Sequence, residues 1–206
     1  MDDTKLKIHT FLPCSYANGP GRRAVIWTQG CSLKCPGCYN PETHSFDGGT
    51  WLSINELYNR VAALGNSIEG ITISGGEPLQ QAEAMAIFLK KLKSSPGLSI
   101  ILFTGYEWKE LERVISEDNS LNSNDLHINR HTLKSILDSI DVLIAGRFIQ
   151  SKRIAKGLRG SSNKTFHFFT NRYTAKDFES LPEAEIVIGP EGNLLISGIN
   201  PPNLNL

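Results

Sequence analysis

The sequence predicts an α/β fold in the form of an incomplete (β/α) TIM-like barrel that is open on one side and ends in a C-terminal β-hairpin. Three observations lead to this prediction. Short strands that are apolar on both faces alternate with amphipathic helices, which is typical of a covered parallel sheet. The last part of the chain instead contains two strand patterns around a turn. The chain has 206 residues, fewer than the about 250 that eight closed strand–helix units typically need.

Apolar runs mark the expected parallel strands. Each run is apolar on both faces, so its strand is expected to be covered on both sides. The runs are AVIWT at 24–28, GITIS at 70–74, LSIILF at 98–103 and DVLIA at 141–145. Because amphipathic segments lie between them, we expect right-handed crossover connections.

The segments between these runs carry helical patterns. SINELYNRVAALG at 53–65 begins with Ser53 and has Glu56 three residues later, which is a capping-box pattern. Its apolar residues repeat at helical spacing, and Gly65 is placed to end the helix. Further helices are expected at 80–92, 107–115 and 131–140.

One domain is expected over residues 1–206, because no internal repeat or low-complexity stretch divides the chain. AEIVIGPEGNLLISG at 184–198 predicts the late hairpin around its PEGN turn. The Asn/Ser-rich segment EDNSLNSND at 117–125 predicts a surface loop.

Composition excludes several classes of protein. The 21 Lys and Arg residues balance 21 Asp and Glu residues, so charge gives no reason to expect a nucleic acid or a membrane surface as partner. The chain begins without a secretory apolar segment and has no run of membrane-spanning length. We therefore expect a cytoplasmic protein. In that reducing compartment, clustered cysteines indicate a metal site rather than disulfides.

The cysteine cluster is the strongest chemical signal. Cys31, Cys35 and Cys38 are spaced C-x3-C-x2-C, while Cys14 stands apart and is expected to be a small half-buried hydrophobic residue. Three thiolates on a short loop can hold three corners of a cubane 4Fe–4S cluster, whose usual complement is four cysteines. One iron would then keep open sites for a substrate or cofactor. The spacing leaves open a zinc site with His44 as fourth ligand.

Glycine-rich and cysteine-rich stretches follow each predicted parallel strand. In barrels and open α/β sheets, active sites form where the loops after neighbouring strands meet. The stretches are QGCSLKCPGCYN at 29–40, GGEP at 75–78, TGY at 104–106 and GRF at 146–148. Their common position predicts one shared site.

The cysteine motif followed by GGEP after the next strand resembles the radical S-adenosylmethionine (radical SAM) superfamily. More narrowly, the order of motifs resembles the activating proteins of anaerobic ribonucleotide reductase. The motifs are NGPGRR at 18–23, QGCSLKCPGCYNPETH at 29–44, ISGGEPL at 73–79, TGY at 104–106, DVLIAGRFI at 141–149 and LRGSSNK at 158–164. The resemblance covers about residues 11–169 as a radical SAM core, and 170–206 form a C-terminal extension.

This resemblance implies a cofactor role for individual residues. The metal ligands of the 4Fe–4S cluster would be Cys31, Cys35 and Cys38, and S-adenosylmethionine (SAM) would chelate the open iron through its amino and carboxylate groups. The residues expected to contact SAM are Gly37, Cys38, Tyr39, Gly75, Gly76, Glu77 and Arg147. No catalytic acid or base is implied beyond the cluster and SAM.

The resemblance also implies the reaction and its partners. An electron donor such as flavodoxin would reduce the cluster, SAM would be cleaved, and the 5′-deoxyadenosyl radical would generate a glycyl radical on a partner enzyme. That partner would be the large subunit of an anaerobic ribonucleoside-triphosphate reductase. Two alternatives stay open: a radical SAM enzyme acting on a small molecule or peptide, and a zinc-binding module without catalysis.

Two departures from the family pattern concern the site and the partner. Ala145 stands where such activases commonly have an aspartate, and Arg147 stands where lysine is frequent. The extension after about residue 170 is longer than in the shortest activases. The other basic residues of this segment are expected to lie on a solvated loop, with a docking surface for an acidic partner patch as the alternative; they are Lys152, Arg153, Lys156, Arg159 and Lys164.

Overall fold

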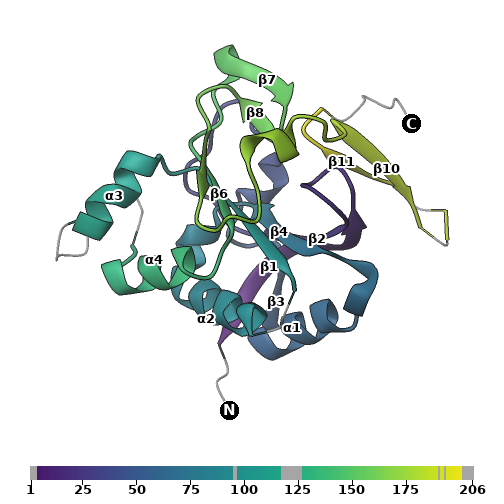
Figure 1. The fold of residues 1–206 in the computed structure, drawn as a ribbon, viewed down its shortest axis with the longest axis horizontal. Coiled ribbons are helices and arrows are strands. Elements are labelled where there is room, and N and C mark those ends of the chain that lie inside the picture. The colour runs from purple at the N-terminus through teal and green to yellow at the C-terminus, as the bar shows by residue number, and fades with distance from the viewer. Residues whose placement is uncertain (1–3, 95–96, 117–126, 190, 193, 201–206) are drawn as a thin grey trace.

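A computed structural model of the protein describes residues 4–94, 97–116, 127–189, 191–192 and 194–200. Within these residues, a seven-stranded mixed sheet forms the centre of the molecule (Figure 1). Its strands follow the order β3 (Thr50–Ser53), β1 (Lys5–Ser15), β2 (Arg23–Thr28), β4 (Gly70–Gly75), β5 (Ser99–Thr104), β6 (Val142–Ala145) and β9 (Thr165–Phe168).

The central strands β2, β4, β5 and β6 are parallel neighbours. They coincide with the predicted apolar runs, and the register places Ile73 between Ile26 and Leu102. The predicted α/β class is therefore confirmed. Strands β1, β3 and β9 pair antiparallel on the two sides of this centre and were not expected. No described strand joins β3 to β9, so the barrel part of the prediction is not confirmed.

Helices cover one face of the sheet. They are α1 (Ile54–Ala62), α2 (Ala82–Lys93), α3 (Trp108–Ser116) and α4 (Arg130–Leu137). Strand β5 shows the two faces, because side chains alternate along a strand. Ile100 and Leu102 pack in the main core with these helices, whereas Ile101 packs with Leu158 and Phe178 on the other face. The predicted helices are thus confirmed, although their ends differ.

The N-cap part of the capping-box prediction is confirmed for α1. The Ser53 hydroxyl accepts a hydrogen bond from the backbone N–H of Glu56 at 3.1 Å. The helix ends at Ala62, earlier than expected, and Gly65 begins a short 3-10 turn. The 3-10 turns among the described residues are η1 (Pro41–Thr43), η2 (Gly65–Ser67), η3 (Pro78–Gln81), η4 (Gln150–Lys152) and η5 (Ala175–Phe178).

Small two-stranded sheets follow in the C-terminal part of the chain. β7 (Arg153–Lys156) pairs with β8 (Arg159–Ser161), and β10 (Ala184–Ile188) pairs with β11 (Leu194–Gly198). The predicted hairpin is confirmed as β10 and β11, whereas the loop predicted at 117–125 lies outside the described residues. None of the described helices has both the length and the apolar character that a membrane span requires.

Candidate active site

A cavity of about 360 Å³ lies at the carboxyl edge of the central strands. Three cysteines line it, Cys31, Cys35 and Cys38, all from the loop after β2. Residues 75–77 at the end of β4 and 104–105 at the end of β5 line the same cavity. The loops after neighbouring strands therefore meet at this edge, which agrees with the single site expected from the sequence.

Backbone hydrogen bonds hold the cysteine loop in a tight conformation. The N–H of Cys31 donates to the carbonyl of His44 at 3.1 Å, and the N–H of Cys38 donates to the carbonyl of Cys35 at 3.1 Å. Gly37, between Cys35 and Cys38 in the chain, has a φ of 72°. Glycine adopts this left-handed conformation without the steric cost that a Cβ brings. The loop can therefore turn between Cys35 and Cys38 and present both on the same cavity.

Burial favours the protonated form of two of these thiols. It raises the pKa of Cys31 to about 11 and also raises the pKa of Cys38. Because thiolates are the form that binds metal, iron must displace these protons when it binds. None of the three cysteines is in a disulfide. Three free thiols around one cavity are a suitable donor set for three corners of a cubane cluster.

The double glycine after β4 lets two backbone segments approach closely. The N–H of Gly76 donates to the carbonyl of Thr28 at 2.8 Å, and the N–H of Glu77 donates to the carbonyl of Gly30 at 2.9 Å. A Cβ on Gly76 would lie 2.3 Å from the carbonyl oxygen of Gly30. Glycine is therefore needed where the β4 loop contacts the cysteine loop, a structural reason in addition to the expected contact with a cofactor.

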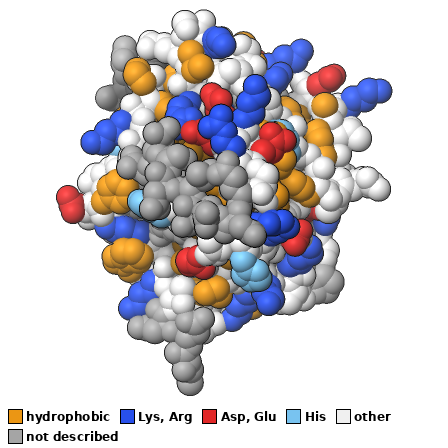
Figure 2. All heavy atoms as spheres, turned by 90° about the vertical axis from the view of Figure 1, so that its left-hand side faces the viewer, with side chains coloured by type: hydrophobic (Ala, Val, Ile, Leu, Met, Phe, Trp, Pro, Cys, Tyr) orange, Lys and Arg blue, Asp and Glu red, His pale blue; other side chains and the backbone are white. Residues whose placement is uncertain are grey.

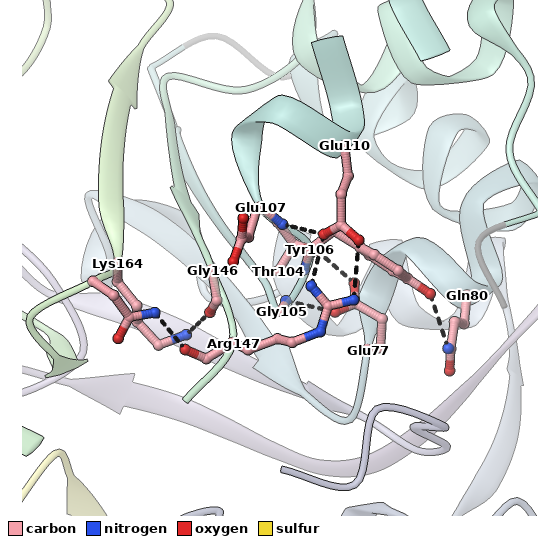
Figure 3. Close-up of polar contacts among 11 residues, drawn as sticks. Glu77, Gln80, Thr104, Gly105, Tyr106, Glu107, Glu110, Gly146, Arg147 and Lys164 are labelled. Carbon is pink, nitrogen blue, oxygen red and sulfur yellow. Dashed lines mark hydrogen bonds and ion pairs between the residues drawn. The ribbon is translucent and has the colours of Figure 1, made fainter. Parts of the chain in front are cut away.

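The carboxylate of Glu77 is buried and connects two loops (Figure 3). One oxygen accepts hydrogen bonds from the N–H of Leu79 and the hydroxyl of Thr104, both at 2.9 Å. The other accepts from the N–H of Gly105 at 2.6 Å. Burial raises the pKa of Glu77 to about 6, although these hydrogen bonds and Lys164 oppose the shift. The TGY motif therefore supplies two of the three donors to the GGEP carboxylate.

The guanidinium of Arg147 is directed toward α3 (Figure 3). It donates to both carboxylate oxygens of Glu110, at 2.7 and 3.0 Å, and lies 5.7 Å from the ring centre of Tyr106. This hydrogen bonding raises the pKa of Arg147. Burial alone would raise the pKa of Glu110, but the bonds from Arg147 and Glu107 outweigh it and lower that pKa. Arg147 does not line the cavity, whereas its neighbour Phe148 does.

Lys164 supplies a cation at the cavity instead. Its ammonium donates to the carbonyl of Gly146, and none of the described Asp or Glu side chains forms an ion pair with it. Burial lowers the pKa of this amine, while Glu77 and the thiols of Cys35 and Cys38 oppose the shift. The expectation of a solvated Lys164 is therefore wrong. The sequence feature that could have indicated a position at the site is the place of Lys164 at the end of the RGSSNK motif.

Tyr39 lies on the wall of the cavity with a polar atom that has no hydrogen-bond partner among the described residues. Its ring packs edge-on against Phe148, with ring centres 5.0 Å apart. A Cβ on Gly160 would lie 2.5 Å from the Tyr39 ring, so glycine leaves room for this aromatic side chain. The Tyr39 hydroxyl is buried and makes no hydrogen bond within the described structure. Such an atom fits a wall that is completed by a polar ligand.

Comparison with known proteins identifies the family. The model of the 4Fe-4S single cluster domain family matches residues 17–167. The anaerobic ribonucleoside-triphosphate reductase-activating protein of Salmonella typhimurium is 30% identical over 170 residues, which cover 79% of this chain and 98% of that protein. The protein of the same name from Enterobacteria phage T4 is 30% identical over 74% of this chain and 87% of its own length. This chain belongs to the family of anaerobic ribonucleoside-triphosphate reductase-activating proteins.

Two further similarities are less extensive. The pyruvate formate-lyase-activating enzyme of Clostridium pasteurianum is 31% identical over 63% of this chain and 56% of that enzyme. The crystal structure of QueE from Escherichia coli superposes with a TM-score of 0.40 at 17% identity, covering 49% of this chain and 52% of QueE.

Membership of the activating-protein family decides between the two metal interpretations. The chain is a radical SAM enzyme, and its cofactors are a 4Fe–4S cluster and SAM. His44 lines the same cavity, but a zinc site that includes it is not needed to explain the cysteines. The zinc-binding module without catalysis is therefore set aside.

Proposed function

We propose that this protein activates an anaerobic ribonucleoside-triphosphate reductase by generating a glycyl radical on it. When bound, the 4Fe–4S cluster and SAM supply reductive cleavage of SAM and the 5′-deoxyadenosyl radical that abstracts a hydrogen atom from the target glycine. The observation that carries the proposal is the meeting of three free thiols with the GGE backbone on one cavity, in a chain of the activating-protein family.

The proposed ligands of the cluster are Cys31, Cys35 and Cys38. They come from one loop and line one cavity, whereas Cys14 lies on β1 and does not line it. The cluster would thus have three protein ligands, which leaves one iron for SAM.

We assign the proposed SAM contacts to both sides of the cavity. On the cysteine side, Gly37, Cys38 and Tyr39 are suited to the adenosyl end, and the unpaired Tyr39 hydroxyl can hydrogen-bond a polar atom there. On the β4 side, the backbone of residues 75–77 is suited to the amino acid end. The Glu77 carboxylate already has three donors, so its main contribution is to hold this backbone in place.

The proposed cation for the SAM carboxylate is Lys164, in place of Arg147. The ammonium of Lys164 has donor capacity beyond its bond to Gly146 and has no carboxylate partner among the described residues. Arg147 is committed to Glu110. Lys164 is half-buried, and an ammonium that is partly removed from water without a counter-ion is costly, so an anionic ligand beside it offsets this cost.

The finer features of the reaction are also proposals. An incomplete barrel, open on one side, suits entry of a glycine-bearing segment of a large partner. A flavodoxin-like protein is proposed as electron donor and the cytoplasm as compartment, since three free thiols close together need a reducing environment to stay unpaired. The balanced net charge supports a protein partner rather than nucleic acid or membrane.

Anaerobic reconstitution tests the proposal in two steps. The protein is loaded with iron and sulfide, then given dithionite and SAM, and 5′-deoxyadenosine is measured. The reductase is then added, and a glycyl radical is sought by electron paramagnetic resonance (EPR). We expect both products. Absence of 5′-deoxyadenosine from a fully loaded protein would refute the chemistry, and cleavage without a radical on the reductase would favour a small molecule or peptide as target.

A further inference from the structure

The hairpin of β10 and β11 is an addition beyond the family core. The family model ends at residue 167, and both strands lie after it. The Salmonella relative is matched over 98% of its own length by 79% of this chain. The chemistry shared by the family therefore does not explain why this chain has the hairpin.

Polar contacts attach the hairpin to the body beside the cavity. The carboxylate of Glu185 accepts hydrogen bonds from the Ser15 hydroxyl and from the N–H of Tyr16, the latter at 2.9 Å. The side-chain amide of Asn18 donates to the Ser197 hydroxyl at 2.6 Å. Residues 195–199 line the cavity itself. The hairpin is thus fixed at the border of the active site.

One face of the hairpin is an apolar strip that runs outward from the cavity. Ile186 lies opposite Ile196 and Ile188 lies opposite Leu194, and directly opposed residues share a face. Ile196 lines the cavity. The other three side chains are exposed, at 49% for Ile186, 70% for Ile188 and 43% for Leu194. The apolar strip is defined here as these four residues.

The hairpin also has unpaired edges. Among the described strands, β10 and β11 pair only with each other, and in Figure 1 they project from the body of the molecule. An isolated two-stranded hairpin is only marginally stable in water, and exposed apolar side chains next to a binding site mark an interaction surface. Both features are accounted for if a polypeptide covers the apolar strip.

We propose that the apolar strip docks an extended apolar segment of the partner reductase, close in sequence to its target glycine. This inference rests on the proposed function. An occupant that covers the whole strip must reach the cavity, because Ile196 lies there. The reaction requires this approach of the reductase but not of a second copy of this chain. An extended segment can also add to the edge of β10 or β11 as a further strand.

The test compares substitutions of the same kind inside and outside the apolar strip. Ile186→Thr and Ile188→Thr are combined in one variant, since threonine keeps the β-branched shape that suits strands. Leu194→Thr is a second variant on the opposite strand. Ile87→Thr is the matched control, because Ile87 is 40% exposed on α2, outside the apolar strip. Each reconstituted holoenzyme is assayed for affinity to the reductase and for 5′-deoxyadenosine formation without it.

We expect the strip variants to bind the reductase about tenfold more weakly, as for loss of central interface residues. Their 5′-deoxyadenosine formation without reductase should stay within about twofold of the unsubstituted protein, a change too small to indicate a damaged site, and the control should match it in both assays. Unchanged affinity for the reductase in both strip variants would overturn the inference. If the unsubstituted protein forms a dimer that the strip variants lose while their reductase affinity is unchanged, the apolar strip binds a second copy of this chain, and the inference is overturned as well. If the unsubstituted protein itself neither cleaves SAM nor forms the radical, the proposed function fails instead.

Discussion

Single residues in the cavity are distinguished by their hydrogen-bond partners. Glu77 is buried with three donors, whereas Lys164 has one carbonyl partner and no described carboxylate. Buried polar groups are normally paired, so the group with remaining donor capacity is the one available to a ligand. Sequence alone could not make this distinction, because the pairing of Arg147 with Glu110 joins residues far apart in the chain.

Cysteine substitutions test the cluster ligands. Cys35→Ala removes one of three proposed iron ligands, so we expect loss of most iron and sulfide after reconstitution and loss of the absorption near about 400 nm typical of such clusters. Cys14→Ala is the control and should load normally. Equal loading of both variants would contradict the assignment.

Substitution of Lys164 tests the carboxylate contact. Lys164→Met should weaken SAM binding by about ten- to a hundredfold, the effect of losing a buried hydrogen bond to a charged group. Arg147→Met should change it by less than about threefold, because that side chain faces Glu110. Binding is measured by equilibrium titration of the reconstituted protein.

A SAM analogue without the carboxylate completes the Lys164 test. Decarboxylated SAM should bind the unsubstituted protein and Lys164→Met with equal affinity, because it lacks the group that Lys164 contacts. The assignment fails if Lys164→Met weakens both ligands equally, or if only Arg147→Met weakens SAM.

At the scale of secondary-structure elements, loops after parallel strands are tied to each other. The β4 loop bonds the end of β2 through Gly76 and the cysteine loop through Glu77, and the β5 loop bonds Glu77. The loop after β6 bonds α3 through Arg147 and Glu110. The site is therefore held by contacts between neighbouring loops.

Gly76→Ala tests the contact between the β4 and cysteine loops. The added Cβ would meet the carbonyl oxygen of Gly30, which is backbone, so the loops must separate. We expect a loss of about 2 kcal/mol in unfolding free energy together with poor cluster loading. Gly65→Ala is the control: it costs about 1 kcal/mol for its positive φ but should load iron normally. Normal loading of Gly76→Ala would contradict this account.

The ion pair between Arg147 and Glu110 predicts a dependence on pH. The pKa of Glu110 in the folded protein is below its ordinary value of 4.5, so its contribution is present above that value and is lost as pH falls through the lower folded pKa. Arg147→Met should cost about 1 kcal/mol in unfolding free energy at pH 7, and the cost should shrink under strongly acidic conditions. Urea unfolding of the metal-free protein and of Arg147→Met, at pH 7 and under strongly acidic conditions, measures this cost. A cost that is the same under both conditions would contradict the prediction.

Elements that are apolar on both faces were predictable from sequence, and others were not. The runs that became β2, β4, β5 and β6 needed no knowledge of their neighbours. Strand β1 begins Lys5, Leu6, Lys7, Ile8, an alternating pattern of a half-buried strand, which differs from the continuously apolar runs that mark the central strands. Strand β9 depends on pairing with β6, which local sequence does not specify.

At the scale of the whole molecule, one buried arginine connects the sheet to the C-terminal region. Arg23 is fully buried and donates to the hydroxyls of Thr72 and Ser99 at 2.8 Å and to the carbonyl of Ile71 at 2.7 Å. It also donates to the Tyr173 hydroxyl at 3.3 Å. Burial lowers the pKa of Arg23 to about 10, so it stays charged at neutral pH. This network lies at the amino ends of the parallel strands, opposite the cavity.

Removal of this guanidinium should destabilise the whole protein. Arg23→Met leaves several buried acceptors without a donor, so we expect a loss of about 3 kcal/mol or more in unfolding free energy. Tyr173→Phe removes one hydroxyl and should cost about 1 kcal/mol. Both are measured by urea unfolding of the metal-free protein, and a cost below about 1 kcal/mol for Arg23→Met would contradict the network's role.

The central claim is that three thiolates hold a cluster whose remaining iron binds SAM. The most direct measurement is the EPR spectrum of the dithionite-reduced, reconstituted protein with and without SAM. The account predicts a 4Fe–4S signal that changes when SAM is added, because the ligands of one iron change. A protein that retains zinc instead, or a cluster signal that SAM leaves unchanged, would contradict it.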